Sequence, residues 1–104
     1  MKHSKLFIFA IMTTLAVSGC KHQAATYPTD TLTTKNGSQL TITFFKHASL
    51  AIETEGRHIY IDPISQYADY ASLPKADLIL ITHSHYDHLD SAAVAAAGGQ
   101  YLRW

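Results

Sequence analysis

The sequence LILITHSHYDH, residues 78–88, decides how the rest of the chain is interpreted. Its first four residues are leucine and isoleucine, a composition typical of a buried strand. Three histidines and one aspartate follow, at positions 83, 85, 87 and 88. Imidazole nitrogens and carboxylate oxygens are the usual ligands of zinc and similar divalent ions. The stretch therefore predicts a strand with metal ligands at its carboxyl end, where open α/β sheets generally place their sites.

The spacing of the four ligand-type side chains divides them into two pairs. Side chains two residues apart on an extended segment point the same way, so His83 and His85 are expected to bind one ion together. Asp87 and His88 follow where the backbone must turn, and they are expected to face a second ion beside the first. A lone histidine at a strand end is more often a solvated loop residue, but this density of ligand-type side chains favours metal ligation.

The H-x-H-x-D-H pattern after an apolar strand resembles the signature of the metallo-β-lactamase superfamily. Residues 45–49 (FKHAS), 59–63 (IYIDP) and 73–77 (LPKAD) look like the branch that contains L-ascorbate-6-phosphate lactonase, and N-acyl-phosphatidylethanolamine phospholipase D lies on a similar branch. The resemblance is specific for the superfamily and much less specific for the substrate. It implies hydrolysis of an ester, lactone or phosphodiester by water activated at a two-metal site. Zinc is the expected metal, with manganese and iron as alternatives.

The resemblance also implies which residues act in the site. The metal ligands would be His83, His85, Asp87 and His88. Asp87 would also be the catalytic residue, because it would both ligate metal and orient the attacking hydroxide. Asp62 would support the loop from behind, as a carboxylate that fixes a histidine tautomer. The alternative for Asp62 is an aspartate that only starts a turn before Pro63.

Three other side chains near the motif have less defined roles. His47 would either line the mouth of the site or form a hydrogen bond within its own hairpin, and both alternatives remain open. His58 matches nothing in the family pattern and is expected to be an exposed strand residue. Tyr86 is expected to pack against the domain.

Turn signals divide the segment before the motif into strands. Asn36-Gly37 is a strong hairpin signal, because both central residues of such a turn need positive φ. Residues 31–34, 40–45, 49–54 and 58–62 are predicted strands that form an antiparallel meander. Asp90 is predicted to cap a helix over residues 92–97. The predicted class is α+β: an antiparallel meander, a metal-ligand loop and a helix, which the resemblance implies are the N-terminal half of an αβ/βα sandwich.

The alternation of the predicted strands gives the sheet an apolar face, with side chains such as Leu50 and Ile52 pointing inward. In the complete sandwich a second sheet would bury this face. Family members are considerably longer than this chain, and their second half supplies a further His, a bridging Asp and another His. The chain is therefore expected to be an N-terminal half that lacks full activity, with a partly exposed apolar face. A second copy or a missing C-terminal half would complete it.

The first residues resemble a bacterial lipoprotein signal. Two lysines precede an apolar segment at residues 6–17, and residues 17–20 (VSGC) resemble a lipobox. The pattern predicts a lipoprotein signal peptide at residues 1–19, a lipidated Cys20 with a tether through residue 30, and a partial metallo-β-lactamase domain over residues 31–104. The alternative is an ordinary secretory signal in which Cys20 is incidental.

The expected location is the bacterial cell envelope, because more than one acyl chain on Cys20 would give stable membrane anchoring. Lys21, rather than aspartate, follows the cysteine, which favours the outer membrane, facing the periplasm or the surface. The net charge of zero gives no indication of a nucleic-acid partner. The expected partners are therefore a small-molecule substrate and the membrane. The alternative function is a non-catalytic metal-binding or degenerate lipoprotein.

Overall fold

The computed structural model describes residues 26–103, which form one mixed sheet and one helix. The predicted signal peptide, Cys20 and the first part of the predicted tether lie outside these residues. The elements in chain order are β1 (Thr29–Thr33), β2 (Gln39–Lys46), β3 (Ser49–Thr54), β4 (Arg57–Ile61), β5 (Leu78–Ile81), α1 (Ser91–Ala97) and β6 (Leu102–Arg103). This arrangement confirms the predicted α+β class. Within residues 26–103, no helix is long and apolar enough to cross a membrane.

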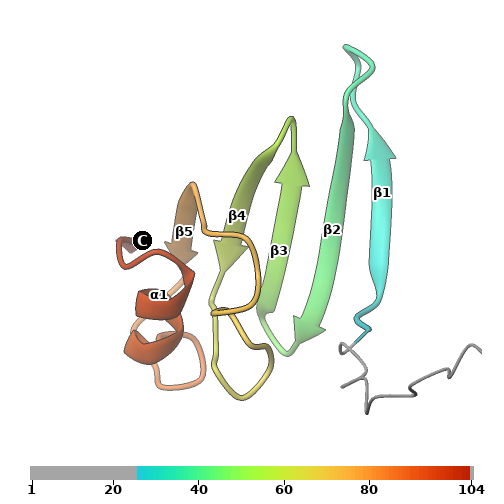
Figure 1. Ribbon diagram of the computed structural model, residues 1–104. Coiled ribbons are helices and arrows are strands. Elements are labelled where there is room, and N and C mark those ends of the chain that lie inside the picture. Colours follow the sequence, from blue (N-terminus) through green and yellow to red (C-terminus); the bar gives the residue numbers. More distant parts are fainter. Residues whose placement is uncertain (1–25, 104) are drawn as a thin grey trace, which may run out of the picture.

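The strands lie in the sheet in the order of the chain, from β1 to β6. The first four are antiparallel neighbours, as the predicted meander requires, whereas β5 is parallel to β4, and β6 is parallel to β5. Figure 1 shows the strands from β1 to β5 side by side, with α1 at the β5 end. The parallel pairing brings the carboxyl ends of β4 and β5 to one edge of the sheet.

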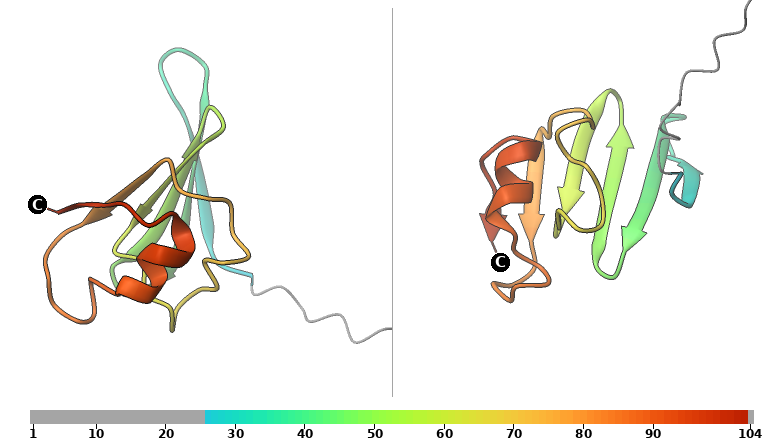
Figure 2. Two further views of the ribbon diagram at one scale, coloured as in Figure 1. Left: turned by 60° about the vertical axis from the view of Figure 1, so that its left-hand side comes forward. Right: turned by 60° about the horizontal axis from the view of Figure 1, so that its bottom comes forward.

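The buried core lies on one face of the sheet, under α1 and the connection between β4 and β5. The register aligns Ala51, Tyr60 and Ile79 across three neighbouring strands. Both views of Figure 2 show α1 beside β5, with the β4–β5 connection nearby. The buried core residues are Tyr60, Ala68, Tyr70, Ile79, Ile81, Ala93, Val94 and Ala97. The helix contributes three of these buried residues, Ala93, Val94 and Ala97.

The opposite face of the sheet is apolar but only partly buried. It carries the alternate residues of the same strands, among them Leu50 and Ile61, which pair across β3 and β4, and Leu80, which pairs with Leu102 of β6. Phe44 and Leu102 are exposed by 41% and 62%. The prediction of a partly exposed apolar face is therefore confirmed. The alternation alone did not indicate that the covered core would form on the other face.

An aspartate cap starts the helix, as the sequence predicts. The Asp90 carboxylate accepts hydrogen bonds from the backbone N–H groups of Ala92 and Ala93, at 2.9 and 3.2 Å. Its second oxygen accepts from the N–H of Ser65, at 2.8 Å. As an acceptor, the carboxylate satisfies two helix N–H groups that have no partner inside the helix. Asp90 therefore joins α1 to the β4–β5 connection.

The first strand begins two residues before the predicted one. Thr29 and Asp30 pair with Thr43 and Ile42 of β2, although they fall inside the segment predicted as a tether. The pairing with β2 extends the strand to these two residues. No local sequence pattern signals such a pairing, because it depends on residues that lie more than ten positions away.

Candidate metal centre

The ligand motif occupies the loop that follows β5 at the carboxyl edge of the sheet. The loop begins at Thr82, whose backbone N–H donates to Oδ1 of Asp62 over 2.7 Å. It turns at residues 86–88, where the N–H groups of His88 and Leu89 both donate to the carbonyl oxygen of His85, each at 2.9 Å. These hydrogen bonds fold the motif back on itself, so that its first and last histidines lie close together.

Asp62 is the anchor of this loop. It directly follows β4, has no exposed surface and has a φ of +45°, a left-handed conformation that is rare for residues other than glycine. Its Oδ2 atom accepts from the Thr82 hydroxyl at 2.6 Å and lies 2.8 Å from Nδ1 of His88. The Ser49 hydroxyl donates to its main-chain carbonyl. A buried carboxylate needs such partners, and here Thr82 and His88, both in the loop after β5, supply them.

The contact with Asp62 leaves one nitrogen of the His88 ring free for another partner. With Nδ1 facing the carboxylate, a neutral His88 ring would carry its proton on Nδ1 and leave Nε2 as the acceptor. Nε2 lies 3.6 Å from Oδ2 of Asp87, on the side of the ring away from Asp62. The His88 side chain is only 14% exposed, so its orientation is fixed by packing as well as by the hydrogen bond. Asp62 thus has the geometry of a carboxylate that sets a histidine tautomer.

Asp87 lies between two imidazoles. Its Oδ2 atom is 3.2 Å from Nε2 of His47 and 3.6 Å from Nε2 of His88. Desolvation at the partly exposed carboxyl acts to raise its pKa. The hydrogen bond from its own backbone N–H and the nearby rings of His88 and His47 outweigh that effect and hold the pKa of Asp87 below its usual range. The carboxyl is therefore an ionised oxygen donor at neutral pH.

The two remaining motif histidines lie beside this group. The ring centroids of His83 and His85 are 4.6 Å apart, and those of His83 and His88 are 3.9 Å apart. Nδ1 of His83 is 3.0 Å from the Thr82 hydroxyl. The loop thus brings the four predicted ligands near one another, but the ligand atoms that all lie within 4.8 Å of one another are those of His47, Asp87 and His88, without His83 or His85. Their individual ligand roles stay a prediction.

The donor set fits a divalent metal ion of the first transition row. Ligand atoms from His47, Asp87 and His88 all lie within 4.8 Å of one another. Two donors that bind zinc at roughly 2.0–2.2 Å with tetrahedral geometry are roughly 3.3–3.6 Å apart. The contacts of Asp87 at 3.2 and 3.6 Å match that spacing. Imidazole nitrogen with carboxylate oxygen is also the ligand chemistry that zinc, manganese and iron accept in proteins.

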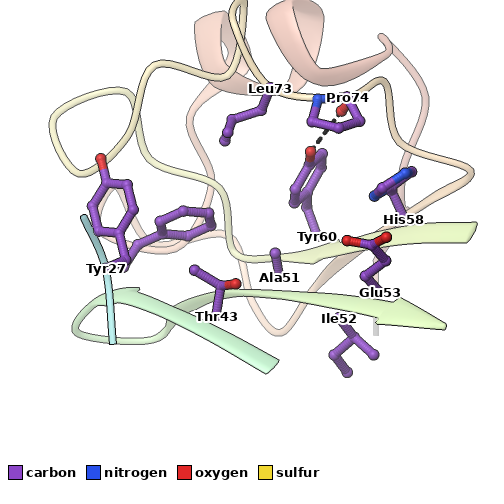
Figure 3. Close-up of a pocket in the computed structure, with 10 residues that line it drawn as sticks. Tyr27, Thr43, Ala51, Ile52, Glu53, His58, Tyr60, Leu73 and Pro74 are labelled. Atoms are coloured by element: carbon purple, nitrogen blue, oxygen red, sulfur yellow. Dashed lines mark hydrogen bonds between the residues drawn. The ribbon is translucent and has the colours of Figure 1, made fainter. Parts of the chain in front are cut away.

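Two expectations about neighbouring residues are wrong. Tyr86 is 90% exposed and does not pack against the domain, because it lies at the tip of the loop. His58 is half-buried on β4, where it pairs with Glu53 of β3. It also lines a separate cavity of about 140 Å³, whose walls contain none of the motif residues. Figure 3 shows this cavity, in which the Tyr60 hydroxyl donates to the carbonyl oxygen of Pro74.

His47, for which the sequence allowed either a place at the mouth of the site or a hydrogen bond within its hairpin, belongs to the cluster. It lies in the two-residue turn between β2 and β3, with Lys46 and Ser49 paired on either side. A family-like His-Ala-Ser sequence was its only signal, and that signal did not specify a contact. The contact with Asp87 depends on how the β2–β3 hairpin and the loop after β5 meet, which local sequence patterns do not report.

Comparisons with known proteins find relatives that are named as metal-dependent hydrolases. A family model described as "Beta-lactamase superfamily domain" matches residues 41–101. A protein of Flavobacterium johnsoniae named as a metal-dependent hydrolase is 50% identical over 60 residues, which cover 52% of this chain and 27% of that protein. A Bacillus pumilus protein with the same name is 41% identical over 64 residues, covering 58% and 28%. The aligned part therefore spans about a quarter of the length of these relatives.

A solved structure gives the same result. The crystal structure of a Parabacteroides distasonis protein, assigned as a metal-dependent hydrolase, superposes with a TM-score of 0.71 and 47% sequence identity. The match covers 73% of this chain and 36% of that protein. Both the fold and the sequence of the described residues are thus similar to one segment of a longer protein.

Proposed function

The chain belongs to the β-lactamase superfamily, and we propose that it acts as part of a metal-dependent hydrolase. The reaction would be the hydrolysis of an ester, lactone or phosphodiester by an activated water molecule. The observation that carries the proposal is the convergence of ligand atoms from His47, Asp87 and His88 within 4.8 Å, directly beside two further histidines of the same loop. The names of the similar proteins from Flavobacterium johnsoniae and Bacillus pumilus support the same reaction class.

In this proposal the motif holds the metal, with zinc as the expected ion and manganese or iron as alternatives. The proposed ligands are His83, His85, Asp87 and His88. When bound, a divalent ion supplies Lewis-acid chemistry that makes water a stronger nucleophile at neutral pH. The family expectation of two ions needs further donors, which would come from a longer form of the protein or from a second copy. The open apolar face of the sheet supports such a completion.

Asp62 and Asp87 have different proposed roles in this site. Asp62 keeps the proton of His88 on Nδ1, so that the Nε2 lone pair faces the metal position. Asp87 is ionised at neutral pH, and its lowered pKa keeps it ionised further into the acid range. Its carboxylate would both hold the metal and accept a hydrogen bond from the attacking water, which would orient the water toward the substrate. The partly exposed position of Asp87 leaves room for a substrate to approach.

We further propose that Cys20 carries lipid and anchors the protein in the bacterial cell envelope, with the outer membrane favoured. This proposal rests on the sequence pattern around residues 6–20. A membrane location would suit a phosphodiester substrate in a lipid, and a soluble lactone is the alternative small molecule.

The test is hydrolysis by the full chain with and without metal. We expect zinc-loaded protein to hydrolyse at least one of three probes, which are p-nitrophenyl acetate, γ-butyrolactone and bis-p-nitrophenyl phosphate. Dialysis against a chelator should remove the activity, and added metal should restore it. The Asp87→Asn variant should bind metal more weakly and lose the activity. Metal binding without hydrolysis of any probe would instead favour a non-catalytic metal-binding lipoprotein.

A further inference from the structure

His47 is the one histidine outside the motif that the described structure brings into the cluster. Its Nε2 atom lies 3.2 Å from Oδ2 of Asp87, and its ring centroid is 5.1 Å from that of His88. It reaches them from the turn between β2 and β3, about 40 residues earlier in the chain. The His47 atom that contacts the carboxylate is thus Nε2, a ring nitrogen that can ligate a metal ion.

The backbone at His47 adopts a conformation that is uncommon for residues other than glycine. Its φ is +56°, in the left-handed region that glycine occupies at much lower cost. The register of the hairpin also shifts between Phe44 and Lys46, directly before the turn. A turn built only for its shape would favour glycine or asparagine at this position. A strained backbone that presents an imidazole to a ligand cluster indicates a role for the side chain.

The positions of the donor atoms indicate what that role is. Asp87 Oδ2 has a nitrogen of His47 on one side at 3.2 Å and a nitrogen of His88 on the other at 3.6 Å. Both spacings agree with ligands of one tetrahedral ion, which are roughly 3.3–3.6 Å apart. Asp87 and His88 are consecutive residues of the loop after β5, whereas His47 comes from the turn between β2 and β3. The His47 side chain is 48% exposed, which leaves space for a further ligand.

We infer that His47 is a third protein donor, through Nε2, to the divalent ion that Asp87 and His88 bind. The inference rests on the proposed function, because it requires a metal at this position. With His47 included, the ion has the three protein ligands that a catalytic zinc commonly uses, and a fourth position stays open. The β2–β3 turn is thereby part of the site. The left-handed backbone at residue 47 presents the imidazole to the metal position.

The experiment is a cobalt titration of the full chain, followed by visible absorption, for wild type, His47→Gly and Glu55→Gly. Glu55 is a matched control, because it has a φ of +51° in the β3–β4 turn and is not part of the cluster. His47→Gly should keep or raise the melting temperature of the metal-free protein, since glycine suits a left-handed turn. Glu55→Gly gains the same backbone relief but loses the exposed hydrogen bond from the Ser38 hydroxyl, so it should stay folded with a melting temperature near that of wild type. Only His47→Gly should lose cobalt affinity, by roughly tenfold or more, since the loss of even a supporting residue has an effect of that size.

A third variant, His47→Cys, tests direct contact with the metal. A thiolate is also a ligand of cobalt and zinc. If residue 47 lies in the coordination sphere, the variant should bind cobalt and show a sulfur-to-cobalt charge-transfer band that wild type, which retains Cys20, does not show. Cobalt binding by His47→Gly as tight as by wild type would overturn the inference while leaving the proposed metal site intact. A wild-type protein that binds no metal would overturn the proposed function itself.

Discussion

The Nδ1 atom of His88 lies 2.8 Å from Oδ2 of Asp62, a carboxylate with no exposed surface. The two residues are 26 positions apart, and they meet because β4 and β5 are parallel neighbours whose carboxyl ends share one edge of the sheet. The hydrogen bond fixes the His88 ring with Nε2 toward Asp87. One buried carboxylate thus links the sheet to the ligand loop.

Asp62→Asn should weaken metal binding without removing any ligand. The amide would place N–H donors where Oδ2 now accepts, so Nδ1 of His88 would have to become the acceptor and the proton would move to Nε2. Loss of such a supporting carboxylate commonly lowers metal affinity by about 10–100-fold. Isothermal titration with zinc measures the effect. Asp69→Asn is the control, because Asp69 is an exposed aspartate that bonds only locally, to Ala71 and Ser72. Equal zinc affinity in the two variants would show that Asp62 does not orient His88.

Asp90→Ala should lower the free energy of unfolding by about 1–2 kcal/mol, the usual effect of losing a helix cap. The loss should lie at the upper end of that range because Ser65 also loses its partner. Urea denaturation followed by circular dichroism measures it. Ser91→Ala changes the neighbouring exposed residue and should have little effect. A loss no larger than that of Ser91→Ala would contradict the role of the cap.

The contribution of Asp90 should also depend on pH. Desolvation acts to raise its pKa, but the hydrogen bonds from Ser65, Ala93 and Ala92 lower it below the ordinary value of 3.8. Because the folded pKa is depressed, the stabilisation is fully present above the ordinary value and is lost as the pH falls through the folded pKa. Unfolding measured from pH 6 downward should therefore show a smaller difference between wild type and Asp90→Asn at low pH. If the difference in free energy of unfolding between wild type and Asp90→Asn grew as the pH fell, the expected direction of the pH dependence would be wrong.

Ile79→Ala should destabilise the domain by about 2–5 kcal/mol, because it leaves a cavity in the core under α1. Ile79 is only 1% exposed. Leu32→Ala removes a comparable side chain that is 57% exposed on β1, and should change the stability by roughly 0.5 kcal/mol or less. Thermal melts of the two variants compare the two sites. Equal losses of stability in Ile79→Ala and Leu32→Ala would contradict the placement of the buried core on the face of the sheet that α1 covers.

Lipidation of Cys20 is a prediction from sequence alone. Bacteria that express the full chain should incorporate labelled palmitate into the protein, and the wild type should fractionate with membranes. Cys20→Ser should abolish the label and release the protein from the membrane fraction, because the acyl chains supply the anchoring energy. Membrane association of Cys20→Ser that equals wild type would favour an uncleaved signal segment instead.

The local patterns predicted the strands well and the packing less well. Residues 49–54 and 78–81 were predicted as strands with the bounds that the structure has, and Asp90 was predicted as a cap. Those features depend on short-range alternation and capping. Which face of the sheet is covered depends on where α1 lies, and the approach of His47 to Asp87 depends on two distant turns. Such long-range relationships have no signal within a short sequence window.

The most direct test of the central claim is the metal content of the purified full chain, by mass spectrometry after dialysis, in wild type and in His88→Ala. We expect about one divalent ion per chain or more in wild type and little or none in His88→Ala, because the variant loses a buried ligand and the hydrogen bond to Asp62. Circular dichroism of both proteins establishes that they are folded. A folded wild type without metal, or equal metal content in the two proteins, would contradict the claim that this histidine–aspartate cluster holds a divalent ion.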